Sequence, residues 1–189
     1  MKTKDRKEKY IAFLRGINVG GHHKVPMAVL RDELEKMGFE NIVTILNSGN
    51  IVFDAICDNT EKLEKSISEH LEIFFGFPVP TIIRKYELIY EFLNNDPFKE
   101  VKITKDVRLY ISFLKNNKEI DLKLPWSSSD NSYKIIDKKH HNIFSVLDLS
   151  KSKTTKAMGT LEIYFGKNIT TRNWNTIKRI VKKIQESNE

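Results

Sequence analysis

The chain has 189 residues, 40% of them hydrophobic and 10% aromatic, which is enough for one large domain or two small ones with a core. No apolar run is long enough to span a membrane, and the charged residues 1–9 do not resemble a secretory signal, so we expect a cytoplasmic protein without a membrane partner. The net charge of +7 favours an anionic partner, although the 25 acidic residues and the lysines gathered at both ends also suit an ordinary soluble surface.

The first half of the sequence predicts the order β-α-β-β-α-β followed by one more helix, which is the ferredoxin-like pattern. Strands are expected where β-branched and aromatic residues gather. Helices are expected where apolar residues recur at helical spacing, beginning near Pro26 and at the capping residue Asn59 and ending at Gly38 and Gly76. The predicted strands span residues 10–17, 41–46, 51–55 and 79–84, and the additional helix spans residues 87–93.

The second half is expected to repeat this order in a degraded form. Residues 118–130 allow a short helix, which Pro125 would interrupt, so the structure of this segment stays open. We therefore predict an α+β protein with two ferredoxin-like βαββαβ halves packed together, residues 8–95 and 104–189, and an extra C-terminal helix. The predicted strands of the second half span residues 107–114, 132–136, 142–148 and 169–171, with helices over 154–165 and from Arg172 or Asn173 onward.

A glycine-rich loop, Arg15 to Lys24, joins the first strand to the first helix. Gly16 and Gly21 have the spacing of a P-loop, but the lysine and hydroxyl residue that should follow are missing, and no G-x-G-x-x-G dinucleotide motif occurs in the loop. Backbone amides in a glycine-rich turn before a helix N-terminus still favour an anion, to which Arg15 or Lys24 could add a charge-assisted bond. A tight turn in which glycine only permits the backbone path is an equally weighted alternative.

Connectivity alone predicts that this loop lies beside the hairpin turn at residues 47–50. In a ferredoxin-like unit the first two strands run parallel through a right-handed crossover, and the third strand pairs with the first. The exit of the first strand and the turn between the second and third strands therefore occupy the same end of the sheet. Ser48 and Asn50 could then contact a ligand, although a turn stabilised by its own side-chain hydrogen bonds explains these residues when the turn is taken alone.

The same reasoning places residues 148–156 beside residues 170–174 in the second half. Ser152, Thr154 and the neighbouring lysines could bind phosphate at a helix N-terminus, or form an ordinary helix cap with a basic flank. The sequence does not decide between a phosphate site and an ordinary helix cap.

Histidine and cysteine give no sign of a metal site or a cofactor. The adjacent pairs His22-His23 and His140-His141 would point to different sides of a strand or helix and have no supporting ligands, so we expect neither a metal nor a cofactor. The single cysteine, Cys57, has no histidine close by in sequence to activate it, and we interpret it as a small apolar residue in a reducing compartment.

Four segments carry a resemblance to a known family: YIAFLRGINVGGHHKVPM, LEKMGFENIVTILNSGNIVFD, KSKTTK and TTRNWNTIKRI. They span most of the chain, and it resembles bacterial proteins grouped as family 1697 of the domains of unknown function. The resemblance implies two ferredoxin-like α+β halves and supplies no activity. Such proteins commonly read RSKLT where this chain begins with Lys151, which weakens a bidentate role at that position. The family patterns point to Arg15, Gly16, Asn18, Gly20, Gly21, Lys24, Ser48, Gly49, Asn50, Lys153, Arg172, Asn173 and Trp174.

We take this set, apart from Trp174, as the predicted ligand-binding residues, and three functional hypotheses follow. The first is a protein that binds a phosphate-bearing ligand, either a nucleotide or nucleic acid, with charge from Arg15 and Lys24, backbone donors from Gly20 and Gly21, and orientation from Asn18 and Asn50. The second is a small enzyme that acts on a phosphorylated or acyl substrate through Lys153 or Ser48. The third is a protein interaction module that uses Trp126 and the basic C-terminal helix.

Overall fold

The computed structural model describes residues 6–56, 59–115, 122–166 and 168–187, so Cys57 lies outside the described residues. The chain divides into two compact units, Met1–Glu91 with Glu186–Glu189, and Phe92–Gln185.

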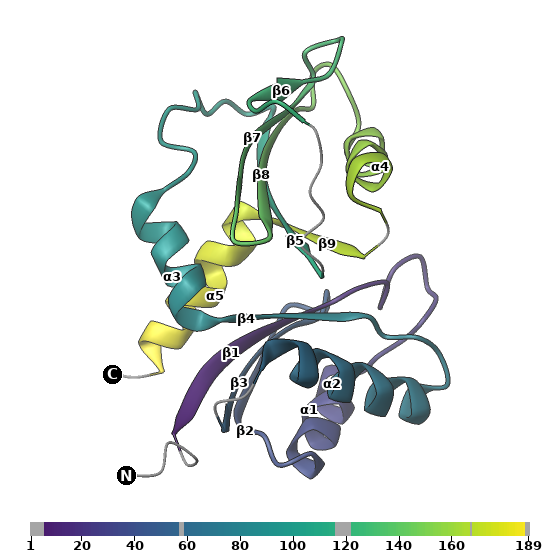
Figure 1. Cartoon of the computed structure of the whole chain (residues 1–189). Coiled ribbons are helices and arrows are strands. Elements are labelled where there is room, and N and C mark those ends of the chain that lie inside the picture. Colours follow the sequence, from purple (N-terminus) through teal and green to yellow (C-terminus); the bar gives the residue numbers. More distant parts are fainter. Residues whose placement is uncertain (1–5, 57–58, 116–121, 167, 188–189) are drawn as a thin grey trace. The chain divides into compact units, whose positions relative to one another are not determined.

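The first unit is a four-stranded antiparallel sheet with two helices on one face (Figure 1). Its strand order is β2-β3-β1-β4, in which β1 pairs with both β3 and β4. This is the ferredoxin-like arrangement that the sequence predicts, and a further helix, α3 (Tyr86–Asn95), follows β4 directly. The elements are β1 (Lys7–Leu14), α1 (Met27–Lys36), β2 (Glu40–Ile45), β3 (Asn50–Ile56), α2 (Thr60–Phe75) and β4 (Thr81–Lys85).

The core of the first unit lies between the sheet and helices α1 and α2. Alternate residues of β1, among them Tyr10 and Leu14, pack against apolar side chains of both helices. Local signals explain where α2 begins and ends: the Asn59 side chain accepts a hydrogen bond from the Glu61 amide, and Gly76 ends the helix with φ +75°. The helical spacing of Leu63, Ile67, Leu71 and Phe74 predicts one buried face for α2, but Phe74 is 47% exposed, and the Lys36 ammonium lies over its ring.

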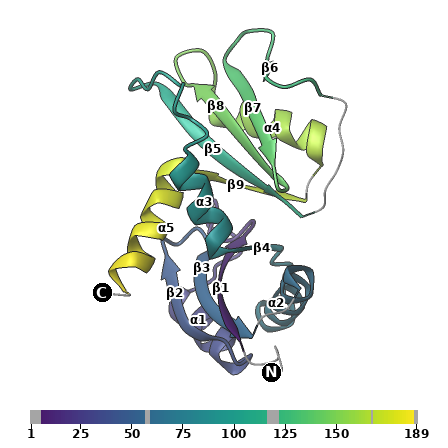
Figure 2. The ribbon, with the colours of Figure 1, turned by 60° about the vertical axis from the view of Figure 1, so that its left-hand side comes forward.

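The second unit repeats this arrangement, except that a short strand stands where the first unit has its first helix (Figure 2). Its sheet has the order β6-β7-β8-β5-β9, and the last four strands reproduce β2-β3-β1-β4 of the first unit. The protein is therefore an α+β protein with two ferredoxin-like halves and a C-terminal helix, as predicted. The elements are β5 (Val107–Leu114), β6 (Trp126–Ser127), β7 (Tyr133–Lys139), β8 (Asn142–Asp148), α4 (Thr154–Phe165), β9 (Ile169–Asn173) and α5 (Trp174–Glu186).

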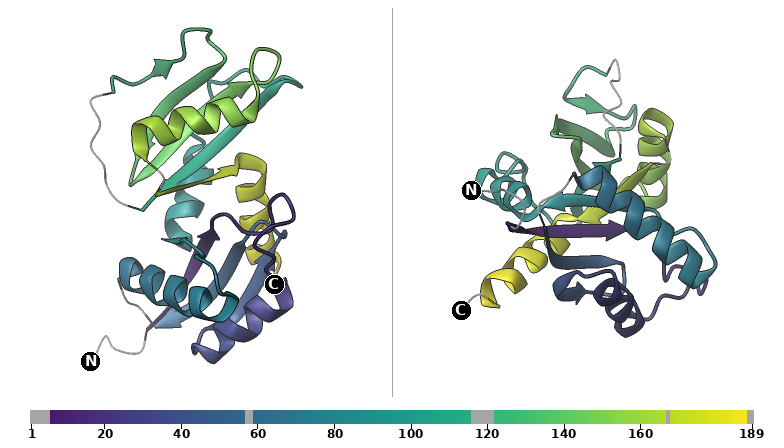
Figure 3. Two further views of the ribbon diagram at one scale, coloured as in Figure 1. Left: turned by 90° about the vertical axis from the view of Figure 1, so that its right-hand side faces the viewer. Right: turned by 60° about the horizontal axis from the view of Figure 1, so that its bottom comes forward.

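The short strand β6 and its flanks occupy the position in chain order that α1 has in the first unit. The sequence allows a short helix over residues 118–130, of which residues 118–121 lie outside the described residues and residues 122–130 form no helix. Leu122, Leu124 and Trp126 instead pack against the core that α4 covers. The Trp126 ring meets that of Tyr164 edge-on at 5.3 Å, so this side chain covers the core. Figure 3 (left) shows α4 lying across the same face of the sheet.

The other face of the second sheet is covered by aromatic residues and α5. Phe144 of β8 meets Phe98 and Trp174 edge-on, with ring centroids 6.0 and 6.3 Å apart. Trp174 opens α5 and is 2% exposed, and the helix buries further apolar residues at helical spacing. Among the described residues, no helix is long and apolar enough to cross a membrane.

Candidate functional site

The glycine-rich loop is a small hairpin that ends beside the first turn of α1. The Asn18 amide donates to the His23 carbonyl at 3.0 Å, and the His22 amide donates to the Val19 carbonyl at 3.1 Å. His23 stacks on Phe77 with ring centroids 4.4 Å apart, and its Nδ1 lies 3.2 Å from the Gly16 carbonyl oxygen. These contacts give the loop a defined conformation.

Asn18 ties the hairpin to its surroundings through its side chain. Its Oδ1 accepts from the Val25 amide at 2.8 Å, and its Nδ2 donates to the carbonyls of Val25 at 3.0 Å and Asn47 at 2.8 Å. Its φ of +55° is a left-handed conformation that asparagine tolerates better than most residues. All these bonds are internal, so Asn18 positions the loop.

The hairpin and the turn at residues 47–50 are neighbours, as connectivity predicts. The ladder between β1 and β3 ends at Phe13 opposite Asn50, and the Leu14 amide donates to the Gly49 carbonyl at 2.8 Å. Gly49 is required there, because a Cβ at its φ of +74° would lie 2.7 Å from the Leu14 Cβ and 2.9 Å from the Ile17 Cδ1.

The buried side chain of Asn50 stabilises the turn through hydrogen bonds. It is completely buried, and its Nδ2 donates to the Ile45 carbonyl at 2.9 Å and to the Ser48 hydroxyl at 3.0 Å. Ser48 is exposed at the tip of the turn. The part that Asn50 takes in any site is therefore to shape the turn.

A pocket of about 500 Å³ opens where the hairpin, the turn and α1 meet. No carboxylate is among its lining residues, and Lys24 is exposed and has no hydrogen bond or ion pair within the part of the chain that the structure describes. Helix α1 begins at the pocket with Pro26 at its N-cap, without a side-chain cap and without an acidic residue in its first turn. The lining residues are Asn18, Gly21, Lys24, Val25, Pro26, Met27 and Asn47.

Three predicted residues of the same loop do not line the pocket. Gly16 and Gly20 are exposed and have left-handed φ values of +74° and +59°. Arg15 is half-buried, and its amide donates to the Pro80 carbonyl at 2.9 Å. These three residues therefore lie outside the described lining of the pocket.

The predicted residues of the second unit gather at one end of its sheet but on different faces. Asn173 lies opposite Tyr110 in the ladder, and the Tyr110 hydroxyl is 3.5 Å from the Thr154 hydroxyl, next to the exposed Lys153 at the start of α4. Arg172 lies opposite Ile111, on the other face of the sheet. Its Nη1 donates to the Thr170 hydroxyl and the Thr171 carbonyl, and burial lowers its pKa to about 10, so it stays charged at neutral pH.

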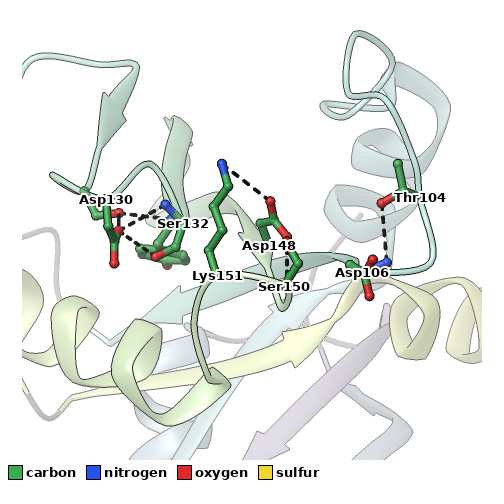
Figure 4. A network of polar contacts seen from close by, with 9 residues as sticks. Thr104, Asp106, Asp130, Ser132, Asp148, Ser150 and Lys151 are labelled. Carbon is green, nitrogen blue, oxygen red and sulfur yellow. Dashed lines mark hydrogen bonds and ion pairs between the residues drawn. The ribbon is translucent and has the colours of Figure 1, made fainter.

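Hydrogen bonds between serines and aspartates stabilise the loops at this end of the second sheet (Figure 4). The Ser150 amide and hydroxyl both donate to Asp148, and the Ser132 amide and hydroxyl both donate to Asp130. These bonds lower the pKa of both aspartates, with Lys156 as the main cause for Asp130. Residues 148–156 and 170–174 are predicted to be neighbours, and the ladders place Asp148 and Asn173 at the same end of the sheet, on the two strands that pair with β5 from either side, opposite Val107 and Tyr110.

Sequence reasoning missed part of the pocket lining. The sequence assigns Pro26 only to the helix start and Asn47 only to the turn, and it does not predict Val25 or Met27 as site residues. Asn47 had a usable signal, because it precedes Ser48 in a turn that was already expected to meet the loop.

These features define a class of α+β protein with two ferredoxin-like halves in one chain, the first of which carries a glycine-rich hairpin against a helix N-terminus. The chain belongs to the family described as "Protein of unknown function (DUF1697)", whose model matches residues 8–143. A solved structure, that of the conserved bacterial protein SP0830 from Streptococcus pneumoniae, is similar, with 28% sequence identity and a TM-score of 0.70 over 94% of this chain and 98% of that one. No curated protein matches.

Proposed function

We propose that the first unit binds a phosphate-bearing ligand, either a nucleotide or a stretch of nucleic acid, in the pocket between the hairpin and α1. The observation that carries this proposal is the chemistry of the lining: an exposed lysine, the backbone of Gly21 and the first turn of a helix face a pocket without a carboxylate among its described lining residues. Its volume of about 500 Å³ suits a small ligand or part of a larger one.

Helix α1 supports an anion at this place for two reasons. The first helical hydrogen bond runs from the Leu30 amide to the Pro26 carbonyl, so the amides before Leu30 have no partner within the helix. The aligned peptide dipoles also place partial positive charge at this end of the helix. An anion here would accept hydrogen bonds from the helix and a charge-assisted bond from Lys24.

The proposal assigns different parts to the predicted residues. Lys24 and Gly21 contact the ligand, while Asn18, Gly49 and Asn50 act as positioning residues, since their contacts with the loop and turn are internal.

Calorimetric titration with a nucleoside triphosphate and with a short oligothymidylate, at low and moderate salt, tests the proposal. Lys24→Ala is expected to weaken binding about tenfold, because a charge-assisted hydrogen bond is lost. Lys134→Ala is the matched control: Lys134 is an exposed lysine on β7, in the other unit, and its replacement should leave the affinity unchanged. The proposal fails if the unaltered protein binds neither ligand, or if the two variants lose affinity equally.

A further inference from the structure

We propose that the second unit contains a separate anion-binding pocket, at the start of β5 and the first turn of α5, that takes a phosphate ester carrying an apolar or planar group. The pocket has a volume of about 300 Å³ and lies within the second unit. It shares no lining residue with the pocket of the first unit, so this inference does not depend on the function proposed above. Its lining residues are Ile103, Thr104, Lys105, Val107, Arg108, Leu109, Asn173, Trp174, Asn175 and Lys178.

Three cationic side chains line this pocket, and none of the described residues that line it carries a carboxylate. Lys105 and Lys178 are exposed and have no ion pair within the part of the chain that the structure describes. Arg108 is held in place, because its Nη1 donates to the carbonyls of Lys105 at 2.7 Å and Val107 at 3.0 Å. Asp106 is a neighbour in sequence but is not among the lining residues. Three uncompensated positive charges around one small cavity favour a dianion such as a phosphate monoester.

The ends of two strands create the cavity. The ladder between β5 and β9 stops at Tyr110 opposite Asn173, whereas the ladder between β5 and β8 continues to Val107. Residues 107–109 therefore have a strand neighbour on one side only, and the chain turns from β9 directly into α5 beside them (Figure 2). Lys178 lies one turn into α5, which returns it to this opening.

Two carboxamides can add donors. The Asn173 Oδ1 accepts from the Asn175 amide at 2.9 Å, which leaves the Nδ2 group of Asn173 to donate elsewhere. The Asn175 side chain is exposed and has no hydrogen bond among the described residues. Helix α5 also begins here without an acidic residue in its first turn.

The remaining wall is apolar and defines the rest of the ligand. Val107 and Leu109 are half-buried and line the pocket together with Ile103, which is 62% exposed. A bare inorganic ion would leave this wall in water, whereas a base or another flat organic group would cover it. A free mononucleotide and a nucleotide within single-stranded nucleic acid both present a phosphate ester beside a base, the first as a dianion and the second as a monoanion, and the experiment distinguishes them.

Nuclear magnetic resonance of the full chain tests this inference through the side-chain amide signals of Asn173 and Asn175. Adenosine monophosphate, oligothymidylate and inorganic phosphate are titrated separately. Saturable shifts of both signals with the mononucleotide, or with the oligonucleotide alone, support the pocket and identify the source of the phosphate ester. Inorganic phosphate is expected to bind more weakly. The proposal is overturned if these signals shift with none of the three probes. It is also overturned if inorganic phosphate binds as tightly as the esters.

Matched variants show whether the lining lysines are responsible. The double variant Lys105→Ala, Lys178→Ala should weaken binding at least tenfold, because two charges facing the phosphate are lost. The double variant Lys99→Ala, Lys134→Ala removes the same net charge from exposed positions outside the lining and should retain the affinity. Lys24→Ala should also leave these shifts unchanged, which separates this pocket from that of the first unit. If both double variants lose the same affinity, the net charge of the protein and not the lining lysines determines binding, and the proposed site is refuted.

Discussion

Gly49 is the residue where the turn and the hairpin approach most closely. Its left-handed φ and the nearby Leu14 and Ile17 side chains exclude a Cβ, so Gly49→Ala should lower the free energy of unfolding by about 2–4 kcal/mol, from backbone strain and overpacking together. Gly21→Ala, where φ is also positive but no atom lies within 4 Å, should lower it by only about 1–2 kcal/mol. Urea denaturation measures both values, and equal losses would contradict the close contact at Gly49.

Asp130 makes stability depend on pH. Hydrogen bonds from Lys156, Ser128 and Ser132 hold the pKa of its carboxyl far below its usual range in the folded protein. A carboxyl with a depressed folded pKa contributes stability above its unfolded pKa of about 4, and this contribution disappears as the pH falls further. The difference in unfolding free energy between the unaltered protein and Asp130→Asn should therefore be full at neutral pH and shrink below about pH 4.

The control for this pH series is Asp32→Asn. Asp32 is exposed on α1 and makes no hydrogen bond among the described residues; it only attracts the exposed Lys36 ammonium through solvent, so its replacement should change stability little at any pH. Denaturation curves across the acid range provide the measurement. A difference for Asp130→Asn that stays constant down to acid pH would show that the carboxylate bonds are not its source.

At the scale of elements, helix α2 protects the open edge of the first sheet. Strand β4 is the last strand of the order, and the amides of Thr81 and Ile83 point away from β1. The Ser68 hydroxyl accepts from Thr81 at 3.2 Å, and the Glu64 carboxylate accepts from Ile83 at 2.8 Å. Glu64 and Ser68 lie one helical turn apart, so one face of α2 satisfies two edge amides that would otherwise be open to another strand.

Glu64 should be the costlier of the two residues to replace. It is 2% exposed and also lies 3.7 Å from Arg84, whose pKa burial lowers to about 10. Glu64→Leu removes one member of a buried charged pair and should lower the unfolding free energy by about 3–5 kcal/mol. Ser68→Ala removes one hydrogen bond and should lower it by about 1 kcal/mol. Thermal and urea unfolding compare the variants, and a smaller loss in Glu64→Leu than in Ser68→Ala would contradict this assignment.

Elements with local signals could be predicted from the sequence. Asn59 and Gly76 mark the ends of α2 through their own backbone preferences, and Pro26 marks the start of α1. The segment around Trp126 could not be predicted in this way. Leu122, Leu124 and Trp126 alternate in a polar stretch, and their conformation depends on the core that they cover.

The two pockets also differ in how much of each could be predicted from the sequence. The meeting of the hairpin and the turn follows from strand order, which the sequence pattern already implies. The bonds from Asn18 to Val25 and Asn47 are tertiary contacts without a local signal. Lys178 is far from Lys105 in sequence, and these two lysines meet at one pocket only because β9 ends early and leads directly into α5.

At the scale of the whole molecule, the net charge of +7 means that the proposed binding of nucleic acid should depend on salt. The logarithm of the affinity for oligothymidylate should fall linearly with the logarithm of the salt concentration, because bound phosphates release counterions. Lys24→Ala should reduce the slope by about 0.7 if its ammonium contacts one phosphate. Fluorescence anisotropy over a salt series measures the slope, and an unchanged slope would place Lys24 away from the phosphates.

The hairpin held by Asn18 and His23 has a consequence for how fast and how tightly a ligand can bind. Its backbone and side-chain bonds already exist without a ligand, so the loop is preorganised and loses little conformational entropy when an anion arrives. Association then needs no rearrangement of the loop and can proceed at the rate of diffusional encounter, which the positive charge of the protein increases.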